Sequence, residues 1–272
     1  MKRFLAGCLI FFIALITFTL ITFVIMKGGF GTDEVAVVNI TGEIYQSGPT
    51  IDLLHTYENR PRVKAIVLRI DSPGGSVAAT QEIYEEVSKI RKKGEKPVIA
   101  SLGSIAASGG YYIACGAGQI VANPGTLTGS IGVIISIMNM EELMKKIGID
   151  VITITSGEHK NIGSATKKLT PKEKKLLQEL IDNIHQQFLR VVIERRGLSP
   201  KQTALIADSR VVTGEQALEY QLIDKIGNLD DAIKIAAQAS GIEGEPKIVT
   251  QRKRLSVLEL ILGSTKLKFH LR

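Results

Sequence analysis

The stretch that decides the fold is residues 63–76, VKAIVLRIDSPGGS. Its first eight residues are apolar at all but two positions and rich in β-branched side chains, which is typical of a buried strand. The turn-forming residues 71–76 then end the strand. Residues 77–93 carry an apolar stripe at helical spacing, and residues 97–102 form the next apolar run. This order of strand, helix and strand predicts the core of an α/β fold.

The same alternation continues outward in both directions and predicts a largely parallel sheet. The further strands are expected at residues 35–40, 120–122, 133–137 and 151–154. The further helices are expected at residues 51–57, 109–117, 172–196, 199 onward, 214–220 and 229–239. In such sheets, functional sites gather at the carboxyl ends of the strands.

The amino-terminal segment predicts a membrane anchor. Residues 1–3 include two basic side chains, and residues 4–26 carry no charge. A helix of that length, at about 1.5 Å per residue, spans the roughly 30 Å hydrocarbon core of a bilayer. The basic end is expected in the cytoplasm and the rest of the chain outside it, in the periplasm or extracellular space. A cleaved secretory signal is the alternative, but the apolar run is long and no clear cleavage site follows it.

Composition divides the remaining chain and restricts its partners. A linker is expected at residues 27–34, one α/β domain at 35–245 and a basic and apolar tail at 246–272, which is either an amphipathic helix or a disordered end. The net charge is +7, but no aromatic residues are interleaved with the basic runs, which argues against nucleic acid as a partner. A membrane surface suits the charge better.

Ser108 is the candidate nucleophile. It lies in SIAASGGYY (residues 104–112), where small residues follow an apolar strand and leave the hydroxyl uncovered. This arrangement of strand, tight turn and helix is that of a nucleophile elbow, in which the amide of Gly109 can donate to a developing oxyanion. The turn DSPGGS can offer a second such amide. Both turns are also compatible with ordinary tight packing.

The residues alone leave the catalytic base open. His159 and Lys160 are adjacent in a polar loop, and either can serve a serine nucleophile. Spacing does not choose between Lys160, Lys167 and Lys168. No metal-binding motif occurs, and no cofactor is expected. Of the two cysteines, Cys8 lies in the apolar run, and Cys115 is expected to be a buried filler.

Several motifs in order resemble the signal peptide peptidase A family. They are DSPGGS, GSIAASGGYYIA, TGSIGV, SGEHKNIGS and LTPKE, and the resemblance extends over residues 35–239. It implies a Clp/crotonase-like fold and a membrane-anchored serine endopeptidase with a Ser-Lys dyad. By this resemblance Ser108 is the nucleophile, Lys160 the base and Ser130 the residue that positions the lysine. Gly75 and Gly109 supply the oxyanion amides.

The resemblance also implies partners. The substrates are hydrophobic peptides, the remnants of signal peptides that leader peptidase has released. The chain length fits the short, single-domain form, which assembles into a homo-oligomeric ring where serine and lysine can come from neighbouring subunits. Two alternatives stay open: a crotonase-like acyl-transfer enzyme, and an inactive membrane-associated scaffold.

Overall fold

The structure is a computed structural model that describes residues 2–26 and 33–251. Within the first of these segments, side chains are described for residues 10–22. The expected linker residues 27–32 and the tail residues 252–272 lie outside the described residues.

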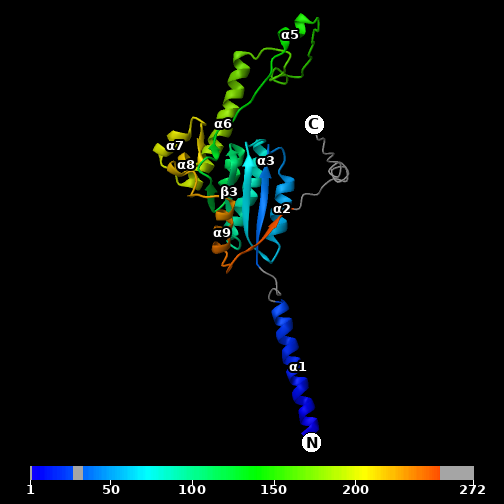
Figure 1. The fold of residues 1–272 in the computed structure, drawn as a ribbon. Helices are drawn as coiled ribbons and strands as arrows, with labels where there is room; N and C mark the ends of the chain where they lie inside the picture. Colours follow the sequence, from blue (N-terminus) through cyan, green and yellow to red (C-terminus); the bar gives the residue numbers. More distant parts are fainter. Residues whose placement is uncertain (1, 27–32, 252–272) are drawn as a thin grey trace, which may run out of the picture.

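Helices and strands alternate along most of the described chain (Figure 1). The helices are α1 (Lys2–Met26), α2 (Gly48–Glu58), α3 (Val77–Lys93), α4 (Gly109–Ala114), α5 (Glu141–Lys146), α6 (Pro171–Arg196), α7 (Pro200–Ile206), α8 (Gly214–Glu219) and α9 (Leu229–Ala239). The strands are β1 (Glu34–Thr41), β2 (Val63–Ser72), β3 (Val98–Ala107), β4 (Gln119–Ala122), β5 (Leu127–Gly129), β6 (Val211–Thr213), β7 (Lys225–Ile226) and β8 (Lys247–Thr250).

The strands form one mostly parallel sheet in the order β6-β5-β3-β2-β1-β8, so the predicted α/β fold is confirmed. β6 is the one antiparallel member among the described strands. β3 changes neighbours along its length: its first half pairs with β4 and its second half with β5. The carboxyl ends of β1, β2 and β3 therefore lie along the same edge.

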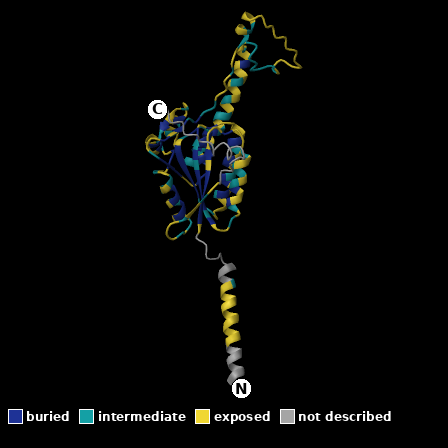
Figure 2. Ribbon diagram, turned by 45° about the vertical axis from the view of Figure 1, so that its right-hand side comes forward, coloured by how far each residue is buried: buried dark blue, intermediate teal, exposed yellow. Residues whose placement is uncertain are grey.

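Both faces of the sheet are covered, which explains why the central strands are apolar at nearly every position. One face packs against α2, α3, α4 and α6, and the other against α9. In β1, Ala36 and Val38 face the first layer, whereas Val35 and Val37 face α9. Figure 2 shows this buried core in the body of the molecule.

Residues Lys2–Met26 form one continuous helix, α1, over the segment for which an anchor was expected. Across the residues and side chains that the structure describes, no helix combines the length and hydropathy that crossing a membrane requires.

The strands expected at residues 133–137 and 151–154 are wrong. Both segments lie outside helices and strands. Apart from Val133, they belong to a projection that we call the arm, residues 134–180, which includes α5 and the first part of α6 (Figure 1). The arm extends away from the sheet, so no neighbouring strand pairs with these segments. Ile134, Ile152 and Ile154 are 86%, 85% and 94% exposed. These segments have the β-branched composition of buried strands, but no helix or sheet in the described part of the same chain covers their exposed isoleucines.

The α/β domain extends beyond its expected end at residue 245. Residues 247–250, which were assigned to the tail, form β8 and pair in parallel with β1. Lys247 contributes an ion pair with Glu34, a carboxylate at the start of β1 that is completely buried and also contacts Arg60. The sheet therefore extends beyond residue 245.

Candidate active site

The two turns singled out in the sequence lie in contact at the carboxyl edge of the sheet. Gly74 follows β2, and Ser108 and Gly109 follow β3. A Cβ atom added to Gly74 would lie 2.6 Å from the amide nitrogen of Gly109 and 3.0 Å from the Cβ of Ser108. No side chain fits between the two turns, which explains why glycine occupies this position.

Ser108 has the backbone conformation of a nucleophile elbow. It lies between β3 and α4 with φ 52° and ψ −121°, a conformation that is rare for residues other than glycine. Its N–H donates to the carbonyl of Gly129 at 2.9 Å, and its carbonyl accepts from Tyr112 at 2.9 Å. Both backbone polar groups are thereby held, and the half-buried side chain stays accessible.

A bulge in β3 sets the position of Ser108 relative to β2. Ile70 pairs with Leu102, but Ser72 pairs with Ala106, so β3 contains two extra residues in this interval. Asp71 stabilises the bulge by accepting a hydrogen bond from the N–H of Ile105 at 3.1 Å. The aspartate thus braces the strand end.

The amides of Gly75 and Gly109 are available to an incoming oxygen. The bridge between Ile44 and Gly75 uses the N–H groups of Ile44 and Ser76 and leaves the N–H of Gly75 out of it. A Cβ at Gly75 would lie 2.2 Å from the carbonyl oxygen of Ile44, so this approach requires glycine. Gly109 is the first residue of α4, where a helix has no internal partner for its N–H.

Ser130 lies beside Ser108 at the end of the neighbouring strand. β5 pairs with β3 in the register that sets Gly129 opposite Ala107. Ser130 also has a left-handed backbone, with φ 51°, and its N–H donates to the carbonyl of Arg210 at 2.8 Å. The structure therefore brings together four of the five predicted site residues.

A mostly apolar pocket opens next to Ser108. Its lining includes Gly75 and Gly109, with Val77, Thr80 and Gln81 from α3, Tyr112 from α4, Gly132, Val133, and Ile184 and Phe188 from α6. Tyr112 is fixed between the rings of Tyr84 and Phe188, with centroid distances of 5.0 and 4.9 Å. No sequence motif predicts these walls, because nothing in the sequence distinguishes the residues of α3 and α6 that form them from ordinary core positions.

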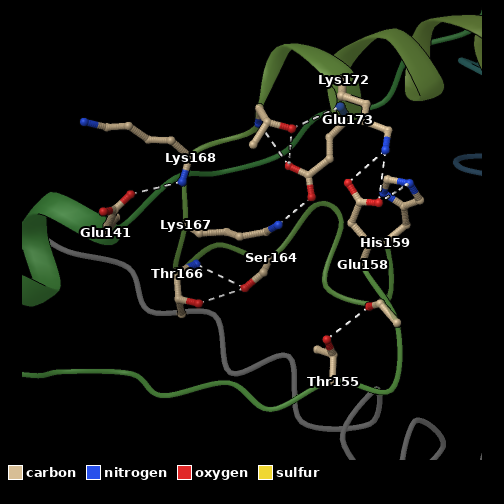
Figure 3. A network of polar contacts seen from close by, with 12 residues as sticks. Glu141, Thr155, Glu158, His159, Ser164, Thr166, Lys167, Lys168, Lys172 and Glu173 are labelled. Carbon is tan, nitrogen blue, oxygen red and sulfur yellow. Dashed lines mark hydrogen bonds and ion pairs between the residues drawn. The ribbon is translucent and has the colours of Figure 1, made fainter.

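Lys160, the fifth predicted residue, does not line this pocket. It lies in the arm between α5 and α6 and is exposed. Its neighbours Glu158 and His159 lie beside the first turn of α6, at the far end of the arm from β3 (Figures 1 and 3). Within one chain, the structure therefore does not bring the candidate base to Ser108, and this holds for His159 as well.

The lysines around Lys160 are paired with carboxylates, and Figure 3 shows two of these pairs, Lys167 with Glu173 and Lys172 with Glu158. The ion pairs are Lys145–Glu141, Lys167–Glu173, Lys168–Glu142 and Lys172–Glu158. Lys160 has no such pair among the described residues. The other three lysines in residues 160–172, Lys167, Lys168 and Lys172, each have one.

Cys115 is excluded as a nucleophile. It lies just after α4 and is buried, as expected for a filler. Burial raises the pKa of its thiol to about 12, which leaves almost no thiolate at neutral pH.

Two protein-family models match the chain. The model described as peptidase family S49 matches residues 90–243, which contain Ser108, Ser130 and Lys160. The model described as Clp protease matches residues 34–128, which contain both turns of the site.

Named relatives agree with these matches. A protein named "Putative protease" from Synechocystis is 42% identical over 77% of this chain and 76% of its own length. Another from Methanocaldococcus jannaschii is 35% identical over 81% of this chain and 75% of its own. A protein named "Putative signal peptide peptidase SppA" from Enterococcus faecium is 39% identical over 63% of this chain and 49% of its own.

A solved structure shares the fold. It is a membrane-bound stomatin-specific protease in which a serine is replaced by alanine. It matches with a TM-score of 0.50 over 82% of this chain and 99% of its own, at 18% identity.

Proposed function

The chain belongs to peptidase family S49, a family of serine-type proteases, and on that premise we propose that it is a membrane-anchored serine endopeptidase that degrades remnant signal peptides. The observation that carries the proposal is the position of Ser108. It lies on a strained elbow and lines, together with Gly75 and Gly109, a pocket with apolar walls.

Ser108 and Lys160 form the catalytic dyad in this proposal. The neutral amine of Lys160 takes the proton from the Ser108 hydroxyl, and the alkoxide attacks the peptide carbonyl. The amides of Gly75 and Gly109 donate to the oxyanion. The protonated amine then gives its proton to the leaving nitrogen, and water hydrolyses the acyl-enzyme. Ser130 orients the amine.

The lysine is supplied by a neighbouring subunit. Lys160 is at the end of an arm that leads away from Ser108 of its own chain, and the arm carries exposed isoleucines. Burying these side chains against a second copy removes apolar surface from water and can carry Lys160 into the neighbour's site. The proposed active form is therefore a homo-oligomeric ring.

The membrane location rests on the amino-terminal sequence. Residues 4–26 are uncharged and follow two basic residues, and they belong to one continuous helix. We assign the amino terminus to the cytoplasm and the catalytic domain to the periplasmic or extracellular side. Hydrophobic signal-peptide segments suit the apolar side chains Val77, Ile184 and Phe188 that line the pocket beside Ser108.

The nucleophile is tested with a fluorophosphonate probe and a synthetic signal peptide. We expect Ser108→Ala to lose labelling and to lower peptide cleavage at least 1000-fold, with assembly unchanged. Mass spectrometry identifies the labelled residue and the products. An assembled wild type that is neither labelled nor active would support the scaffold alternative.

The shared site is tested by mixing inactive chains. Ser108→Ala and Lys160→Ala are each expected to be inactive, and co-expression is expected to restore a fraction of wild-type activity, because some interfaces combine an intact serine with an intact lysine. His159→Ala is the matched control and should stay active. Failure of the mixed assembly to recover activity would contradict a dyad formed between subunits.

A further inference from the structure

Ser209, in the loop between α7 and β6, has a strained backbone. Its φ of 63° places it in the left-handed region, which residues other than glycine and asparagine rarely adopt. Its hydroxyl donates to the carbonyl of Ile131 at 2.8 Å. Strain of this kind persists where the surroundings require it, and it gathers at functional sites.

The loop that carries Ser209 grips residues 130–132 at consecutive points. Beside the Ser209 bond, the carbonyl of Arg210 accepts from the N–H of Ser130 at 2.8 Å. Gly132 packs so closely that a Cβ there would lie 2.3 Å from the Ser209 hydroxyl oxygen. Ile131 is buried between these contacts. The segment is thus fixed by two hydrogen bonds and one steric contact.

The gripped segment is a wall of the pocket beside Ser108. Gly132 and Val133 line that pocket together with Val77, Thr80 and Gln81 of α3. The arm begins at residue 134, where the chain leaves the body and exposes its side chains. Among the described residues, the bond from Ser209 to Ile131 is the side-chain hydrogen bond nearest to the start of the arm that holds this wall.

We infer that Ser209 is a positioning residue for substrate binding. Its hydroxyl fixes the pocket wall 130–133 against movement of the arm, so that a peptide side chain meets a preformed surface. The role in substrate binding rests on the proposed function. The clamp, by which we mean the contacts of Ser209 and Arg210 with residues 130–132, does not depend on it.

The experiment compares Ser209→Ala and Ser209→Gly with the wild type. Both variants remove the hydroxyl, but glycine also relieves the left-handed strain, so a general loss of stability cannot explain an effect that the two variants share. Ser240→Ala is the matched control, because it removes a hydroxyl that bonds the carbonyl of Ala236 in α9, away from the site. Amide hydrogen exchange, peptide kinetics and fluorophosphonate labelling are measured on the full chain.

We expect amides of residues 130–133 to exchange about fivefold faster in both variants, the factor that corresponds to one hydrogen bond. The KM for the signal peptide should rise by about the same factor with kcat nearly unchanged, because Gly132 and Val133 line the pocket, whereas the N–H of Ser130 keeps its bond to the carbonyl of Arg210. Labelling of Ser108 by the small fluorophosphonate should stay within twofold of the wild type. Ser240→Ala should match the wild type in all three.

Unchanged exchange at residues 130–133 would overturn the clamp. Faster exchange with an unchanged KM would overturn the positioning role, and so would a loss of peptide cleavage and labelling in equal proportion. A wild type that cleaves no peptide and takes no label would refute the proposed function instead, and the exchange result would still decide the clamp.

Discussion

At the scale of single residues, the site is marked by backbone strain. Three of the four left-handed residues other than glycine in the described chain are serines at or beside the site: Ser108, Ser130 and Ser209. Such conformations cost on the order of 1–3 kcal/mol each. The sequence identified Ser108 and Ser130 by their motifs, but Ser209 lies in no motif, because a hydrogen bond across 78 positions leaves no local signal.

The strain at Ser108 can be measured directly. We expect Ser108→Gly to be more stable than Ser108→Ala by about 1 kcal/mol, because glycine adopts a positive φ without steric cost. Both variants should lack peptidase activity. Urea unfolding of the two proteins, side by side, measures the difference. Equal stabilities would show that the conformation of Ser108 is relaxed.

At the scale of elements, capping explains a motif that family resemblance only flagged. LTPKE begins α6: Thr170 is the N-cap, Pro171 the first helical residue, and Glu173 completes the capping box. Glu173 is buried and also pairs with Lys167 (Figure 3). The sequence predicted the start of this helix to within one residue, because the signals for a helix start are local.

Glu173 makes the stability of α6 dependent on pH. Hydrogen bonds from Lys167 and from the backbone of Thr170 lower the pKa of this carboxyl to about 2. A lowered pKa stabilises the fold above the ordinary carboxyl pKa of about 4.3, and this contribution is lost as the pH falls from there toward 2. The loss of stability in Glu173→Gln should therefore be constant above about pH 5 and shrink below it.

Urea midpoints of the wild type and Glu173→Gln between pH 2 and 7 measure this dependence. Glu179→Gln is the control, since Glu179 is exposed and its pair with Lys175 is 4.0 Å long. A difference between Glu173→Gln and the wild type that stays the same at all pH values would contradict a charge effect.

At the scale of the whole molecule, the sequence predicted the sheet and the meeting of the two turns at its carboxyl edge, but not the arm. Residues 133–137 and 151–154 have the composition of strands, and composition does not reveal whether a covering layer comes from the same chain. Lys160 was predicted as the base from its motif and the family resemblance, and that role stays a prediction. The separation of Lys160 from Ser108 depends on where the arm points, which no local pattern encodes.

In the proposed assembly, the arm makes the interface between subunits sensitive to charge. We expect the double substitution Ile152→Asp and Ile154→Asp to convert the proposed oligomer to smaller species and to lower peptidase activity at least tenfold, because burying two carboxylates at an interface is costly. Light scattering after gel filtration measures the mass. Lys234→Asp on α9 is the control and should assemble normally. If the variant with both aspartates still forms the intact oligomer, the arm is not part of the interface.

The distance between the arm and the site has a consequence for when the enzyme works. If the proposed dyad forms between subunits, a single subunit is inactive, so activity should rise more steeply than linearly with the concentration of chains at low abundance. Newly made copies would then be inactive until they assemble, and would not cleave neighbouring proteins before that point. If the chain is anchored in a bilayer, its concentration within the plane of the membrane would determine when assembly and activity begin.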